Sequence, residues 1–152
     1  MSTRSLTTLI DDFTGKEIVA IYRHSDGYPS GQGKDLAEFL KTVKVTNGFS
    51  VWPPEWGPKK IQANGMSSLT ALLVQKLLEI TPSIYINAPG SFDMGEEYFY
   101  TIKGGADREL TMEVRDCPVD RKDPRKAKPM FSGTPDEFLE WLKKGEKGEQ
   151  DE

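Results

Sequence analysis

The stretch IVAIYRHSDGYPSGQGKDLAEFL, residues 18–40, predicts a strand, a polar turn and a helix in immediate succession. Its first four residues are apolar without alternation, which is typical of a strand covered on both faces and central in its sheet. Leu36, Phe39, Leu40 and Val43 recur at helical spacing and predict an amphipathic helix lying on that sheet. Any ligand site is expected in the turn, because glycines before a helix start bring backbone N–H groups together.

The patterns on either side of this stretch predict an α+β domain. We expect an antiparallel hairpin from 5–10 and 18–22, a largely enclosed helix over 67–80, and a capped helix from Thr134 that ends near Gly145. Further strands are expected at 83–87, 97–103 and 109–115, the last two joined at Gly104 and Gly105. This order favours a two-layer sandwich, a mainly antiparallel sheet with about three helices on one face.

Composition restricts the classes of protein and of partner. The 152 residues suit one domain, 1–145, followed by a flexible acidic tail, 146–152. A net charge of −4 disfavours a nucleic-acid duplex as the partner. The single cysteine, Cys117, excludes an intrachain disulfide and a multi-cysteine zinc site, and we expect no metal or cofactor. No window has the apolar length of a membrane span, so we expect a cytoplasmic protein without a membrane partner.

The glycine-rich turn resembles a phosphate-binding P-loop but departs from its pattern. A P-loop needs G-x-x-x-x-G-K-[ST], so that amides wrap phosphate and a hydroxyl holds magnesium. Here the glycines are one residue too far apart and Asp35 follows Lys34. The sequence therefore disfavours nucleotide hydrolysis and leaves a more general anion site.

The first hypothesis is a non-enzymatic protein that binds a small anionic ligand. Arg23 and the helix start at Gly31 and Gly33 would bind phosphate, unless Arg23 instead forms a salt bridge with Asp26, Asp35 or Glu38. Aromatic side chains would stack on a base. The complete set of candidate ligand-binding residues is Arg23, His24, Asp26, Tyr28, Ser30, Gly31, Gly33, Trp52, Trp56, Ser67 and Tyr98.

Four segments carry a resemblance to a known group of proteins. They are Tyr22–Leu40, with the pattern Y-R-x-x-D-G-Y-P-S-G-x-G-x-x-L-A-x-F-L, together with Thr3–Ser5, Asn64–Met66 and Gly95–Tyr100. In these segments the chain resembles a family of small phage, prophage and bacterial proteins. By analogy with small phage proteins that sequester cyclic-nucleotide or ADP-ribose immune signals, the resemblance implies a counter-defence role with a nucleotide-derived ligand.

Two other functions and an assembly state remain open from the sequence. A hydrolase or phosphodiesterase would use His24, the only histidine, with Asp26 and Glu97. A protein-binding inhibitor would use the aromatic loop from Trp52 to Trp56 as its anchor. We also expect a homo-oligomer, because small binding proteins often build a pocket between subunits.

Overall fold

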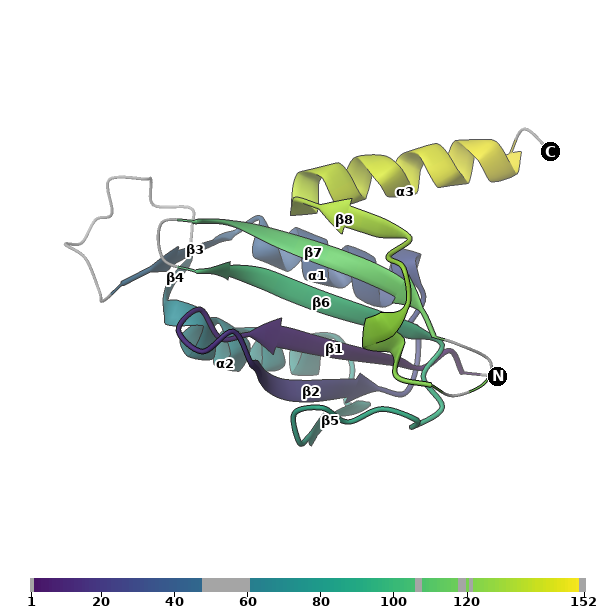
Figure 1. The fold of residues 1–152 in the computed structure, drawn as a ribbon. Helices are drawn as coiled ribbons and strands as arrows, with labels where there is room; N and C mark the ends of the chain where they lie inside the picture. The colour runs from purple at the N-terminus through teal and green to yellow at the C-terminus, as the bar shows by residue number, and fades with distance from the viewer. Residues whose placement is uncertain (1, 48–60, 106–107, 118–119, 121, 151–152) are drawn as a thin grey trace.

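The computed structural model describes residues 2–47, 61–105, 108–117, 120 and 122–150. Within them the chain forms a six-stranded sheet, a two-stranded sheet and three α-helices (Figure 1). The large sheet contains β1 (Ser5–Ile10), β2 (Glu17–Arg23), β5 (Ile84–Asn87), β6 (Tyr98–Gly105), β7 (Arg108–Asp116) and β8 (Phe131–Gly133). The other elements are β3 (Val43–Thr46), β4 (Ile61–Asn64), α1 (Lys34–Leu40), α2 (Gly65–Ile80) and α3 (Pro135–Gln150). The predicted α+β class is confirmed.

The order of strands in the large sheet is β5-β2-β1-β6-β7-β8. The expected antiparallel hairpin forms between β1 and β2, and β2 lies inside the sheet between β5 and β1, as its apolar run predicted. Neighbouring strands are antiparallel except β1 and β6, which run parallel with Ser5 opposite Tyr98. The sheet is therefore mixed, a detail that the pattern of single strands did not predict.

A parallel pair, β3 and β4, lies beside the helices and was absent from the sequence-based prediction. Val43, assigned to the helical stripe, instead begins β3, and α1 ends at Leu40. Val43 and Val45 alternate with polar residues, but a four-residue strand offers too few positions to distinguish its period from the helical one. The coincidence that Val43 lies seven residues after Leu36 produced the wrong assignment.

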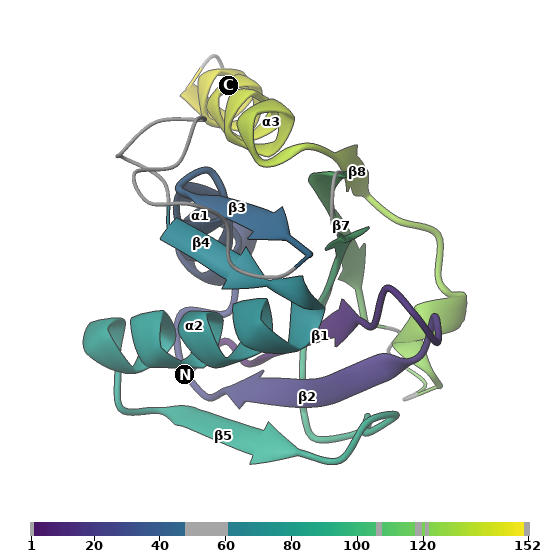
Figure 2. The same ribbon diagram turned by 90° about the vertical axis from the view of Figure 1, so that its left-hand side faces the viewer.

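The main core lies between one face of the large sheet and the helices. Leu9, Ile21 and Tyr100 from the sheet pack with Leu73 of α2 and Phe138 of α3, all completely buried. Figure 2 shows the sheet curving around the helices, with β5 and β2 below α2 and β8 beside α3. This layer of helices on one face agrees with the predicted sandwich.

The opposite face of the sheet has a smaller core of its own. Leu6, Ala20 and Phe99 form this second cluster. The Arg125 guanidinium lies 4.7 Å from the centre of the Phe99 ring and pairs with Glu17 at the start of β2. These contacts hold the segment around Arg125, which precedes β8, against the second face of the sheet. The central strands β1, β2 and β6 are therefore buried on both faces.

The start of α3 is the predicted capping box. The Thr134 N–H donates to Glu137 Oε1 at 3.0 Å, and the Glu137 N–H donates to Thr134 Oγ1 at 3.2 Å. The far end differs from the prediction, because α3 continues beyond Gly145 to Gln150. Glycine in a helix interior is unfavourable but does not by itself end a helix.

Replacing Thr134 by Ala should lower the free energy of unfolding by about 1 kcal/mol, because one N-terminal amide of α3 loses its acceptor. Urea denaturation at pH 7 measures the loss. Glu137→Gln, which keeps the reciprocal bond, is the control and should cost less.

The cap lowers the pKa of the Glu137 carboxyl by hydrogen bonding to Thr134. Its ionised form therefore stabilises the fold above the ordinary value of 4.5, and the penalty of T134A should shrink as the pH falls below that value.

Candidate functional site

The glycine-rich turn after β2 is closed by contacts within its own chain. Pro29–Gly33 form one π-helical turn that leads directly into α1. The Gln32 N–H donates to the Asp26 carbonyl at 2.8 Å, and a Cβ at Gly31 would lie 2.2 Å from the same oxygen. At Gly33 a Cβ would lie 2.5 Å from the Phe138 ring. Both glycines are therefore required by close packing inside the protein, because a side chain at either position would collide with its neighbours.

Arg23 is part of the protein interior, with 3% of its surface exposed. Its Nη1 donates to Asp35 Oδ2 at 2.7 Å and to Gln32 Oε1 at 2.8 Å, and its Nε donates to the Ser25 carbonyl at 2.7 Å. Gln32 in turn donates from Nε2 to Thr7 Oγ1 at 3.0 Å. Of the two interpretations of Arg23, these contacts favour the ion pair with Asp35 over an open anion site.

The exposed side chains of the turn pair with one another at the surface. The Tyr22 hydroxyl lies 2.9 Å from His24 Nδ1, and the Tyr28 hydroxyl donates to Asp26 Oδ1 at 3.1 Å. The second bond, with the negative charge of Asp26, raises the pKa of Tyr28. Asp26 has φ = +55°, a conformation that Asp tolerates better than most residues. His24 and Asp26 thus have different partners.

The remaining predicted site residues are spread over the molecule. Tyr98 packs against the main core, and burial is the main reason its pKa is raised. Glu97 is exposed and lies across β1 from His24, so the structure does not join them into one catalytic set. Ser30 is exposed in the turn and Ser67 in the first turn of α2. Trp52 and Trp56 lie outside the described residues.

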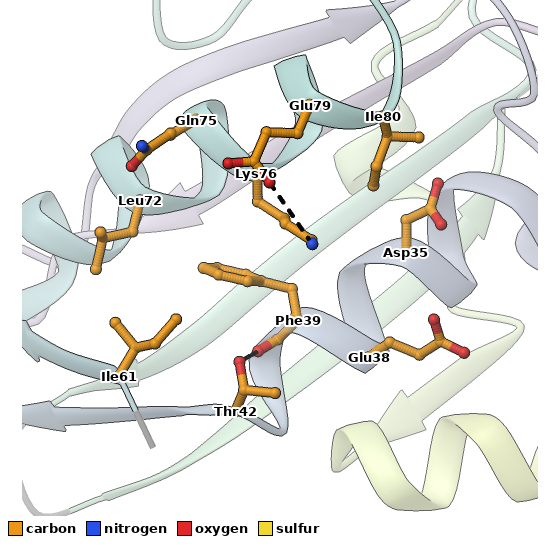
Figure 3. Close-up of a pocket in the computed structure, with 10 residues that line it drawn as sticks. All are labelled: Asp35, Glu38, Phe39, Thr42, Ile61, Leu72, Gln75, Lys76, Glu79 and Ile80. Atoms are coloured by element: carbon orange, nitrogen blue, oxygen red, sulfur yellow. Dashed lines mark hydrogen bonds and ion pairs between the residues drawn. The ribbon is translucent and has the colours of Figure 1, made fainter. Parts of the chain in front are cut away.

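A cleft of about 600 Å³ lies between α1 and α2 (Figure 3). Its apolar surface comes from Phe39 of α1, Leu72 and Ile80 of α2, and Ile61 of β4. In Figure 3 the Leu72 side chain points toward Ile61, and Phe39 lies between the two helices. Ile61 is 45% exposed and Ile80 43%, so part of this apolar surface is open to solvent.

Most of the charged side chains that line the cleft are acidic. Asp35 and Glu38 project from α1, and Glu79 projects from α2 beside Lys76, whose Nζ is 3.7 Å from a Glu79 carboxylate oxygen. The Asp35 carboxylate lines the cleft and also forms the ion pair with Arg23. Three carboxylates therefore face one ammonium group around an apolar centre.

The cleft was not predicted from the sequence, although one signal for it was present. The helix over 67–80 was expected to be largely enclosed, yet Leu78 is 51% exposed. Leu72, Lys76, Glu79 and Ile80 recur along α2 on one side, next to the fully buried stripe that contains Leu73. A stripe of mixed charged and apolar residues next to the buried face of a helix is typical of a groove that is partly open to solvent.

Two smaller hollows are also lined by described residues. Two hollows of about 250 and 230 Å³ share Arg108, and the smaller lies where Gly65 begins α2, beside the exposed ring of Phe13. In the described part of the chain no three His, Cys, Asp or Glu side chains are grouped to hold a metal ion. None of the described helices has the length and apolarity needed to span a bilayer.

Comparison with protein-family models, with curated proteins and with solved structures finds no match to this chain. The interpretation of the site therefore depends on its own geometry and chemistry.

Replacing Asp35 by Asn should destabilise the protein, because it leaves Arg23 buried without a counter-charge. Breaking one side of a buried ion pair typically costs about 3–5 kcal/mol. Asp35 is 24% exposed, so we expect a loss of about 2–4 kcal/mol. Urea denaturation measures it, with Glu38→Gln on the exposed face of the same helix as the matched control, expected within about 0.5 kcal/mol of the wild type. Equal losses in the two variants would contradict a structural role for the Arg23–Asp35 pair.

Cys117 should react slowly with thiol reagents. Burial first, and then the negative charges of Glu96, Asp116 and Glu97, raise the pKa of its thiol to about 12. Alkylation by iodoacetamide at pH 8 should be roughly a hundredfold or more slower than for an exposed cysteine, because the thiolate is the reacting form. The same protein unfolded in urea is the control and should react at the ordinary rate. Rapid alkylation of the folded protein would show that the thiol is accessible and ionised.

Proposed function

We propose that this protein is a non-enzymatic binding protein that holds a small organic ligand in the cleft between α1 and α2. The observation that carries the proposal is the cleft itself. Its volume of about 600 Å³ lies within the range of about 300–1,000 Å³ typical of small-molecule sites. Such sites combine apolar walls with a few polar groups, as Phe39, Ile61 and Leu72 do here with the charged side chains around them.

The chemistry of the lining supports binding without turnover. The described lining residues include no histidine, cysteine, serine or tyrosine. The hydroxyl of Thr42, the only one in that set, donates to the Phe39 carbonyl at 2.7 Å. His24, the candidate base of the hydrolase hypothesis, lies on β2's continuation and is bonded to Tyr22 instead. A ligand bound in the cleft would meet three carboxylates, the Lys76 amine and the Gln75 amide, without the histidine, serine or cysteine of the commonest catalytic sets.

The anionic, nucleotide-derived ligand stays a prediction, and two observations count against it. Arg23 is neutralised by Asp35, and the cleft next to this pair is lined by carboxylates. The counter-defence role rests only on the resemblance carried by the four sequence segments. The homo-oligomer and the inhibitor that acts through Trp52 and Trp56 also stay predictions.

A binding screen by two-dimensional NMR of the ¹⁵N-labelled protein tests the proposal. The compounds are cyclic dinucleotides, ADP-ribose and small aromatic or alkyl molecules that carry positive, negative or no charge. We expect at least one compound to shift amide signals of 34–42 and 72–80 together, because the cleft lies between these segments. Mass spectrometry should recover the bound compound unchanged.

Two variants with the same substitution locate the binding. Leu72→Trp should weaken binding about tenfold or more, because the larger indole ring occupies the space that the ligand needs. Leu78→Trp, on an exposed part of α2 outside the cleft lining, should leave binding unchanged. Binding that survives L72W, or a screen in which no compound shifts both segments, would refute the proposal.

A further inference from the structure

The charges around the α1–α2 cleft indicate which class of ligand it selects. Asp35, Glu38 and Glu79 line it with negative charge, and Lys76 provides the single positive charge among the described lining residues. A concave site lined mainly by one sign of charge concentrates ligands of the opposite sign. Such a ligand preference rests on the proposed binding function of the cleft.

The three carboxylates are not equally available to a ligand. Asp35 is engaged by Arg23 at 2.7 Å, in a pair with only 3% of the arginine exposed. Glu79 is near Lys76, but the distance is 3.7 Å and both side chains are about half exposed, so this pair is weak. Glu38 is exposed and forms no ion pair with any described residue. Glu38 is therefore the carboxylate with most capacity to accept a new positive charge.

The position of Glu38 relative to the apolar surface gives the shape of a matching ligand. Glu38 immediately precedes Phe39 and both line the cleft, but in Figure 3 the Phe39 ring points toward Leu72 whereas the Glu38 carboxylate points away from that ring. Phe39 is only 6% exposed, so an apolar group in the cleft would cover mainly the half-buried Leu72 and the exposed Ile61 and Ile80. A charge placed at Glu38 would remain at the open rim, where its desolvation cost is small.

We infer that the cleft binds a small organic cation, a protonated amine or guanidinium attached to an aromatic or alkyl body, with Glu38 as the residue that determines charge selectivity. The cationic group lies at Glu38, with support from Glu79, and the apolar body lies between Phe39 and Leu72. Anionic compounds are rejected at the same rim by repulsion from these carboxylates.

Three probes with one indole ring system test the inference: tryptamine is cationic, tryptophol is neutral and indole-3-acetate is anionic. Each is titrated into the ¹⁵N-labelled protein, and signals of 34–42 and 72–80 give the dissociation constants. We expect tryptamine to bind about fivefold or more tightly than tryptophol, as one or two partly exposed ion pairs allow, and indole-3-acetate to bind most weakly. The advantage of tryptamine over tryptophol should decrease as salt concentration rises.

Glu38→Gln should reduce the affinity for tryptamine about threefold to fivefold and leave that for tryptophol unchanged. Glu140→Gln on α3 alters the net charge equally, is exposed and lies outside the cleft lining, so it is the matched control and should leave both affinities unchanged. Equal binding of the three probes, preference for indole-3-acetate, no binding of tryptamine, or equal effects of E38Q and E140Q would overturn the inference. If other compounds of the wider screen still bind in a manner that L72W abolishes, the proposed function stands while the cation preference fails.

Discussion

The arrangement of the site depends on one buried charge, the guanidinium of Arg23 at the end of β2. A buried arginine is costly unless its charge is paired and its N–H groups are hydrogen-bonded. Asp35 supplies the charge, and Gln32 and the Ser25 carbonyl accept the other bonds. Because Asp35 belongs to α1, its pairing with Arg23 fixes the start of α1 relative to the sheet. The position of α1 in turn determines the shape of the cleft between α1 and α2.

The most distinctive segments of the sequence meet at one end of the sheet, where they hold each other in place. The Gly27 N–H donates to the Thr3 carbonyl, the Glu97 N–H donates to the Arg4 carbonyl, and the Tyr100 hydroxyl donates to the Gly27 carbonyl at 2.7 Å. Their unusual residue types follow from close packing and from the burial of polar groups. A conspicuous motif therefore marks a structural junction here, whereas the candidate binding surface lies beside it on two ordinary amphipathic helices.

The sequence was sufficient for features that depend on local physics. The hairpin of β1 and β2, the helix α2 and the Thr134–Glu137 cap each follow from periodicity or from a few adjacent residues, and the structure confirms them. Features that depend on contacts between residues far apart in the sequence could not be predicted from local patterns. The parallel pairing of β1 with β6, the short pair of β3 and β4, and the choice of Asp35 as partner of Arg23 all require knowledge of which segments meet in space. The cleft belongs to this second group, because neither helix alone contains it.

The parallel contact between β1 and β6 has a consequence for how the chain acquires its structure during synthesis. Leu6 and Leu9 of β1 pair with Phe99 and Ile102, so the centre of the sheet joins residues that are 93 positions apart in the chain. The hairpin of β1 and β2 emerges from the ribosome early, but its inner edge has no partner until β6 has been translated. Closing so long a loop is slow, and an exposed strand edge invites pairing with other chains. Until β6 pairs with it, the free edge of β1 in the nascent chain is open to intermolecular pairing.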